Sequence, residues 1–439
     1  MTGLRKTLAK LARLRRRWEK NLDAARRSGT NGSGLARQVD RLQEVASFGS
    51  NPGNLRMLVY APDALPSDPA LVVALHGCTQ TAAVYDHGTG WSTLADRFGF
   101  VVLYPEQQRS NNPQGCFSWF LPDDIARDQG EALSIRQMVE RAIIDYGIDR
   151  RRVFVTGLSA GGAMSSVLLA TYPDVFAGGA IIAGLPYGCA TSVEEAYECM
   201  FQGCVASDRE LGDRVRAASR HKGPWPKISV WHGSEDAVVK PSNADGILRQ
   251  WINVHGLSIH PLLEDVVDGY PRRLWRNAGE TVIEAFSITG MAHGVPLATG
   301  IGAQTCGAAG AFLIDVGISS SYHIARFFSL EDRQAKVEQA EVRTTTPGVA
   351  AAASSRQPAW EIEVSTTSRD YWRSGSDDDA NAPAGTARPI DPSSVIAAAF
   401  KAAGLPVPEF EIPVHGNTPP DPRPIIEATL KAAGLLRPR

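Results

Sequence analysis

The sequence predicts an α/β protein with a mostly parallel, doubly wound sheet, and three observations lead to this fold class. Short runs rich in β-branched residues alternate with stretches of helical period through residues 45–330. The runs are apolar, as expected for strands of a parallel sheet that helices cover on both faces. One run enters a serine flanked by glycines, and a helix-forming stretch follows that serine directly.

The expected strands and helices alternate along the chain. Strands are predicted by the runs LRMLVYAP, ALVVALHG, FGFVVLYP, RRVFVTG, GGAIIAG, KISVWHG and TVIEAFSIT. Helices are predicted near residues 130–146, after the glycine-flanked serine, and near residues 208–218, 243–254 and 311–328. Because this alternation runs without a break, we expect one domain over residues 45–330.

Composition excludes several classes of protein. The chain has 439 residues, with 45 Lys and Arg against 47 Asp and Glu. No apolar run approaches the ~18 residues that a membrane-spanning helix needs, so we expect no transmembrane segment. Six cysteines are too few for a disulfide-stapled scaffold. No His or Cys spacing resembles a zinc site, and we expect neither a metal nor another cofactor.

Residues 1–34 form a basic segment before the predicted domain. The first 30 residues hold ten Lys or Arg and two acidic residues, with apolar residues at helical spacing. We expect an amphipathic helix that packs on the main domain, followed by a flexible joint, SGTNGSG, from Ser28. The alternative is contact with an anionic surface such as phospholipid, nucleic acid or a storage-granule coat, and nucleic acid is not favoured. The apolar stripe is Leu4, Leu8, Leu11, Trp18, Leu22 and Ala25.

The chain changes character after residue 330. Residues 331–390 are rich in Ala, Ser, Thr, Arg, Asp and Pro with little periodicity, which predicts a low-complexity linker or disordered segment. Residues 391–439 hold two copies of a short helix pattern, VIAAAFKAAGL from Val395 and IIEATLKAAGL from Ile425. Each copy ends with a glycine suited to a left-handed cap, so two short helical repeats are expected.

The glycine-flanked serine is Ser159, in the segment GLSAG between a predicted strand and a predicted helix. In a nucleophile elbow the turn is too sharp for side chains at the flanking positions, which are Gly157 and Gly161 here. The serine is then held on a strained, exposed turn. An unreactive glycine-rich turn is the alternative, and the strand-turn-helix context favours the nucleophile.

A serine nucleophile needs a neutral imidazole to take its proton and a carboxylate to orient that imidazole. The elbow fold places these residues in the chain order Ser, acid, His. Asp236 follows the run KISVWHG, and His293 lies in a glycine-flanked loop after TVIEAFSIT, so we expect them to be the acid and the base. Rival acids are Glu235, Asp245 and Asp265, and rival bases are His232 and His323.

Acyl transfer also needs backbone N–H donors directed at the developing oxyanion. Ala160, directly after the nucleophile, supplies one donor. The loop after the run ALVVAL holds His76, Gly77 and Cys78, and we expect the Cys78 N–H to be the second donor. His76 is expected to be a buried polar residue that holds this loop, rather than a catalytic one.

Seven motifs follow one another through the predicted domain: HGCTQTA at His76, LYPEQ at Leu103, NNPQGCFSWF at Asn111, GLSAGGAM at Gly157, AGLPYGCA at Ala183, HGSEDAVV at His232 and GMAHGVP at Gly290. Together they resemble the esterase family of polyhydroxybutyrate (PHB) depolymerases, which is related to the feruloyl and acetyl-xylan esterases of carbohydrate esterase family one. The resemblance covers roughly residues 45–330. It implies an α/β-hydrolase fold and Ser159, Asp236 and His293 as the catalytic triad.

The resemblance also bears on the cysteines and on localisation. It implies a disulfide between Cys78 and Cys116; the alternative is a pair of buried free thiols. Secreted depolymerases carry an export signal and often a separate substrate-binding domain, whereas the basic segment here does not read as a secretory signal. Localisation therefore stays open between the cytoplasm, which the segment favours, and secretion, which the family favours.

The expected function is a serine esterase that cleaves short-chain poly- or oligo(3-hydroxyalkanoate) through an acyl-enzyme on Ser159. The alternatives are a feruloyl or acetyl-xylan type of esterase, and a non-catalytic, granule-associated protein of the hydrolase fold. The aromatic residues near the motif loops are candidates to line the acyl pocket, although core positions are at least an equal interpretation; they are Tyr85, Trp91, Trp119 and Phe120. We expect activity on small esters to need the central domain alone.

Overall fold

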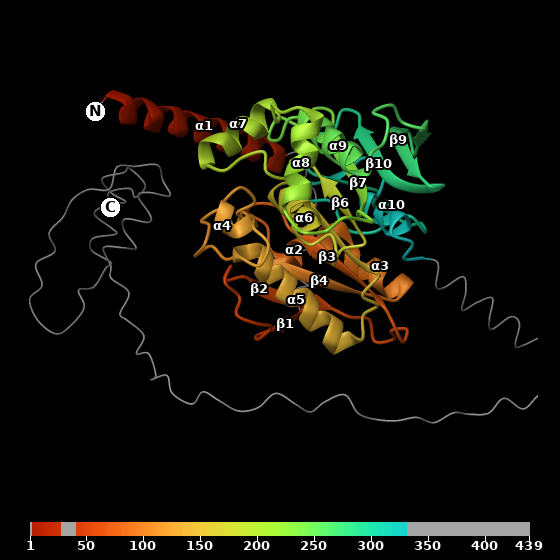
Figure 1. Ribbon diagram of the computed structural model, residues 1–439. Coiled ribbons are helices and arrows are strands. Elements are labelled where there is room, and N and C mark those ends of the chain that lie inside the picture. Colours follow the sequence, from red (N-terminus) through yellow and green to blue (C-terminus); the bar gives the residue numbers. More distant parts are fainter. Residues whose placement is uncertain (1, 28–40, 332–439) are drawn as a thin grey trace, which may run out of the picture. The chain divides into compact units, whose positions relative to one another are not determined.

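The computed structural model describes residues 2–27 and 41–331 (Figure 1). The described residues from Leu8 onward belong to one compact unit. The predicted joint at residues 28–34, the predicted linker beyond residue 331 and the two predicted repeats at residues 391–439 lie outside the described residues. Among the described helices, none has both the length and the apolar character needed to cross a membrane.

A ten-stranded sheet forms the centre of this unit, in the order β1-β2-β4-β3-β5-β6-β7-β10-β9-β8 (Figure 1). Every pairing from β4 through β10 is parallel, and antiparallel strands flank this block at both edges. A separate parallel pair joins β11 and β12. The strands are β1 (Gln43–Val45), β2 (Arg56–Tyr60), β3 (Ala70–Leu75), β4 (Phe100–Glu106), β5 (Val153–Leu158), β6 (Gly178–Ile182), β7 (Lys227–Gly233), β8 (Leu263–Val267), β9 (Tyr270–Asn277), β10 (Glu280–Ile288), β11 (Val295–Leu297) and β12 (Leu313–Asp315).

The parallel block is covered on both faces. Every residue of β3, β4, β5 and β6 is buried, and successive strand residues point to opposite faces of a sheet. The apolar character of the predicted runs follows from this double burial. The helices are α1 (Thr2–Arg27), α2 (Ala82–Thr89), α3 (Trp91–Phe98), α4 (Pro122–Ile125), α5 (Gly130–Tyr146), α6 (Ala160–Thr171), α7 (Val193–Gln202), α8 (Asp208–Ala217), α9 (Ser242–His255) and α10 (Ser320–Phe327).

All seven predicted strands are present, as β2 to β7 and β10, and four of the five predicted helices are α5, α6, α8 and α9. The fifth prediction, a helix near residues 311–328, is wrong in its first half. Residues Leu313–Asp315 form β12, which pairs with β11. Gly317 then takes a φ of 81°, so the helix begins only at Ser320.

Helix α1 packs on the α/β core of this unit, as its apolar stripe predicts. Trp18, Leu22 and Ala25 are buried, whereas the basic residues of the helix are mostly exposed. Lys10 forms ion pairs with Glu194 and with Glu198, both on α7, and Figure 1 shows the two helices side by side. The second half of this helix therefore packs through its apolar stripe, as the packing interpretation expects.

Candidate active site

Ser159 lies at the turn between β5 and α6, with a φ of 57° that side-chain-bearing residues rarely adopt. A Cβ on Gly157 would lie 2.5 Å from the backbone of Gly161, and one on Gly161 would lie 2.3 Å from the carbonyl oxygen of Leu75. Both glycines are therefore sterically required, as the elbow motif predicts. The Ser159 N–H donates to the Ile182 carbonyl at 2.9 Å, which ties the turn to β6.

Asp236 follows the end of β7 and is held rigidly by its own loop. Its side chain is buried, and Oδ1 accepts hydrogen bonds from the N–H groups of Val238 at 2.8 Å and Val239 at 2.9 Å. The other oxygen, Oδ2, lies 2.6 Å from Nδ1 of His293. Both predicted residues thus come together, although 57 positions separate them in the chain.

His293 lies in the loop between β10 and β11 and is 1% exposed. Since Nδ1 is bonded to Asp236, Nε2 is the ring atom left to face a reacting group. Nε2 is buried and has no hydrogen-bond partner among the described residues. His293 and Ser159 line the same narrow cavity. The structure therefore brings all three predicted triad residues to one place.

The surroundings of Asp236 keep it charged. Burial raises the pKa of this carboxyl, but the charge of His293 and hydrogen bonds from His232 and His293 outweigh that effect. The net pKa lies well below the ordinary value. An ionised carboxylate at neutral pH is the form that orients an imidazole and stabilises its cation.

The rival residues have other partners. His232 is buried, with Nε2 2.9 Å from the Val239 carbonyl and 3.3 Å from Oδ2 of Asp236, so it contacts the acid and its loop. Glu235 is exposed. The remaining rivals have separate partners. Asp245 and Asp265 form ion pairs with Arg273 and Arg272, and Nε2 of His323 lies 2.8 Å from Oδ2 of Asp268.

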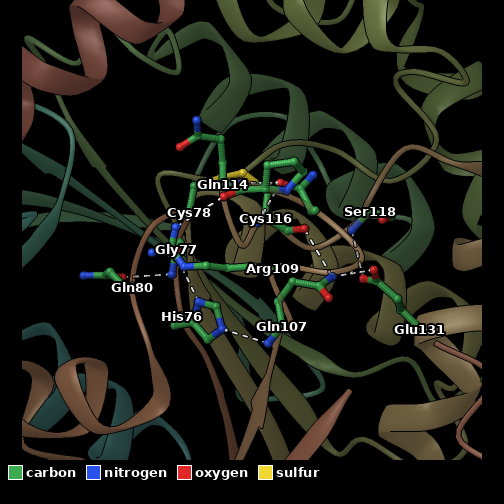
Figure 2. Close-up of a disulfide and its surroundings, with 12 residues drawn as sticks. His76, Gly77, Cys78, Gln80, Gln107, Arg109, Gln114, Cys116, Ser118 and Glu131 are labelled. Atoms are coloured by element: carbon green, nitrogen blue, oxygen red, sulfur yellow. Dashed lines mark hydrogen bonds between the residues drawn. A yellow bond between two sulfur atoms is a disulfide. The ribbon is translucent and has the colours of Figure 1, made fainter. Parts of the chain in front are cut away.

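The loop after β3 is held by a polar network (Figure 2). Burial lowers the pKa of His76, so its ring is neutral, and Nε2 accepts a hydrogen bond from the Gln107 N–H at 3.1 Å. Nδ1 then donates to the Gly77 carbonyl at 2.8 Å, and Oε1 of Gln80 accepts from the Gly77 N–H at 2.9 Å. His76 therefore has the structural position that the sequence predicted. Cys78 and Ala160, the two predicted oxyanion donors, both border the cavity that holds Ser159.

Cys78 and Cys116 form a disulfide beside this loop (Figure 2). It joins the predicted oxyanion donor to the loop that leads to Trp119. The Thr79 N–H donates to the Gln114 carbonyl at 2.6 Å and ties the same two loops together. The four other cysteines, Cys189, Cys199, Cys204 and Cys306, are free thiols.

We expect reductant to lower the thermal stability of the protein. The disulfide spans a sequence separation of 38 residues, and a loop of that length restricts the unfolded chain by roughly 3–4 kcal/mol. Differential scanning calorimetry with and without reductant measures the shift. A variant with Cys78→Ser and Cys116→Ser is the control, since reductant should leave its melting temperature unchanged. An equal shift in this variant would show that reductant acts elsewhere.

An apolar cavity of about 180 Å³ opens beside Ser159. Trp119 and Phe120, two of the candidates from the sequence, line it together with Leu185 and Met200, which the sequence analysis did not assign. The prediction for Tyr85 and Trp91 is corrected. Both are fully buried in the core, on faces of α2 and α3 that turn toward the sheet, and Trp91 packs edge-on against Phe100 of β4.

Comparisons with known proteins bear on the chemistry of this site. The family model "Esterase PHB depolymerase" matches residues 56–260. Poly(3-hydroxyalkanoate) depolymerase C of Paucimonas lemoignei is 50% identical over 294 residues, which cover 66% of this chain and 71% of that protein. Acetylxylan esterase of Coprinopsis cinerea is 35% identical over 264 residues, covering 58% and 70%.

A solved structure shares the fold. The acetyl xylan esterase from Aspergillus awamori has a TM-score of 0.56 and 28% sequence identity, and the match covers 66% of this chain and 99% of that one. Together with the parallel sheet and the elbow between β5 and α6, this likeness shows the α/β-hydrolase fold.

Proposed function

The chain belongs to the esterase PHB depolymerase family, and we propose that it hydrolyses carboxylic esters through an acyl-enzyme on Ser159. One observation carries the proposal. Nδ1 of His293 lies 2.6 Å from Oδ2 of Asp236, while His293 and Ser159 line one cavity. This is the arrangement in which an imidazole can take a proton from a serine hydroxyl.

The proposed reaction has two halves. In the first, Oγ of Ser159 attacks the ester carbonyl as Nε2 of His293 takes the hydroxyl proton. The N–H groups of Cys78 and Ala160 stabilise the oxyanion, and the alcohol leaves with the proton from His293. In the second half, water repeats the attack on the acyl-enzyme, and Ser159 is restored. Asp236 stays ionised throughout and stabilises the imidazolium.

The acyl group of the substrate is proposed to be short. The cavity of about 180 Å³ is smaller than the roughly 300–1,000 Å³ of ordinary ligand pockets, and Trp119 and Phe120 give it an apolar wall. A 3-hydroxybutyryl group fits this description, and the relative named poly(3-hydroxyalkanoate) depolymerase C supports it. The similarity to acetyl xylan esterases favours acetyl esters as a second candidate, with an equally short acyl group.

Contact of residues 1–30 with a granule or another anionic surface also remains a proposal. The exposed residues Arg13, Arg16 and Lys20 of α1 support an electrostatic contact. The apolar stripe at Trp18, Leu22 and Ala25 is occupied by packing on the catalytic unit, so the contact would be made by the charged face.

A panel of esters tests the proposed substrate class. We expect the full chain to hydrolyse p-nitrophenyl acetate and butyrate with a kcat/KM at least about tenfold above that for the octanoate, because the cavity excludes a long acyl chain. Hydroxybutyrate oligomers should be cleaved faster than methyl ferulate. A preference for the octanoate or for methyl ferulate would contradict the proposal, and a preference for acetylated xylan would select the second candidate.

A further inference from the structure

Helix α1 lies over the proposed nucleophile. Trp18 lines the cavity of about 180 Å³ together with Ser159. Leu22, one helical turn later, lines a second, narrower cavity together with Ser159 and His293. Residues four apart lie on one face of a helix, so a single face of α1 covers the serine on two sides.

The helix is fixed to the elements that build the site. The ring of Trp18 meets Tyr197 of α7 edge-on, with 6.2 Å between the ring centroids. Arg17 lies over the ring of Phe201 at 4.4 Å. Nδ2 of Asn21 donates a hydrogen bond at 2.6 Å to the carbonyl of Ala237, the residue next to Asp236. The contact surface of α1 is thus the catalytic face of the unit.

The two sides of Ser159 have different roles in ester cleavage. The alcohol part of the ester must lie beside Nε2 of His293, because that atom protonates the leaving oxygen. Leu22 occupies this side, and Phe312 closes the same space. The acyl part has the larger cavity on the other side, where Trp18 forms part of the wall.

We propose that α1 is a roof over the substrate site, and that Leu22 and Trp18 are specificity-determining residues of the esterase. The proposal rests on the proposed function and deepens it. While Leu22 is seated, it narrows the space for the alcohol part and disfavours an extended polyester, which continues on both sides of the scissile bond, relative to esters of smaller alcohols. Trp18 limits the length of the acyl chain.

This roof is supplied by a part of the chain that the family model does not include, since the matched residues begin at Arg56. The proposal bears on the expectation that small-ester activity depends on the central domain alone, which stays a prediction. The triad residues come from that domain, but two walls of the substrate space come from α1. Substrate selection by this chain would then differ from that of a family member without such a helix.

Substitution of Leu22 in the full chain tests the leaving-group side. The measured quantity is the ratio of kcat/KM for a linear trimer of 3-hydroxybutyrate to kcat/KM for methyl 3-hydroxybutyrate. Leu22→Ala should raise this ratio about tenfold or more, because it opens the space beside His293. Leu22→Phe should lower the ratio, because it fills that space further. Circular dichroism confirms that each variant is folded.

Leu14→Ala is the matched control. Leu14 lies on the same helix and packs partly buried against the core, but it lines none of the cavities at Ser159. Its substitution removes the same atoms without opening the site, so the ratio should stay within about twofold of the wild-type value. An equal rise in Leu14→Ala would show that the helix acts by detaching, and would overturn the assignment to Leu22.

Trp18→Ala should have a different signature. It should raise kcat/KM for p-nitrophenyl octanoate relative to the acetate, with little change in the trimer ratio. If the Leu22 variants leave the trimer ratio unchanged and Trp18→Ala leaves the octanoate-to-acetate ratio unchanged, the proposal that α1 covers the substrate site is overturned. If the wild-type chain hydrolyses none of these esters, the esterase proposal fails on its own. Access to Ser159 can then be measured by labelling with a small and with a bulky fluorophosphonate. If the ratio of the two labelling rates is the same in wild type and in Leu22→Ala, the proposal that α1 covers the substrate site is overturned separately.

Discussion

Ser159→Ala should lower the rate of ester hydrolysis by roughly 10⁴- to 10⁶-fold and leave the protein folded. The substitution removes the nucleophile, and the residual rate comes from substrate binding and the oxyanion donors alone. Alanine keeps the backbone hydrogen bond from residue 159 to Ile182, so the turn between β5 and α6 should persist. Initial rates on p-nitrophenyl butyrate and circular dichroism measure the two halves of the prediction.

Ser165→Ala is the matched control for this variant. Ser165 is a buried serine on α6, the helix that follows Ser159, and its Oγ donates to the Gly161 carbonyl at 2.9 Å. Its loss should change the rate by no more than a few fold. Retention of more than a tenth of the wild-type activity in Ser159→Ala would show that another residue is the nucleophile.

Asp236→Asn should cost about 10⁴-fold in kcat, and the reason lies in the loop around the acid. Oδ1 of Asp236 accepts from two N–H groups, those of Val238 and Val239. An asparagine would keep its carbonyl oxygen toward these donors and turn its amide NH₂ toward Nδ1 of His293. That nitrogen would then have to accept, so the ring would carry its proton on Nε2, where it cannot take the proton of Ser159.

Glu235→Gln is the control for the acid, since Glu235 is adjacent in sequence and exposed. We expect the Glu235→Gln variant to hydrolyse p-nitrophenyl butyrate at a rate within a few fold of the wild-type rate. If this change proved more damaging than Asp236→Asn, the role of the acid would have to be reassigned to Glu235.

The elbow and the triad could be predicted from the sequence because local rules decide them. Gly157 and Gly161 are required by contacts within one strand-turn-helix unit, so their spacing identifies Ser159. Asp236 and His293 follow the ends of strands that the apolar runs already indicate. Parallel strands bring their carboxyl ends to one edge of the sheet, and residues distant in sequence meet there.

Other features depend on tertiary contacts that periodicity does not encode. Strands β8 and β9 lie at the sheet edge and carry charged, largely exposed residues, so they lack the apolar signal of the central strands. Tyr85 and Trp91 follow a motif loop in sequence, yet their helix faces turn into the core. For α1 the periodicity predicts a buried face, but it cannot predict that this face lies over Ser159.

Covalent labelling tests the central claim most directly, which is that Ser159 is activated by His293 and Asp236. The wild-type chain is incubated with a small fluorophosphonate, and peptide fragmentation by mass spectrometry locates the added mass. We predict one modification, on Ser159, with labelling abolished in Ser159→Ala and greatly slowed in Asp236→Asn. Modification of another residue, or labelling at the wild-type rate in Asp236→Asn, would contradict the proposed triad.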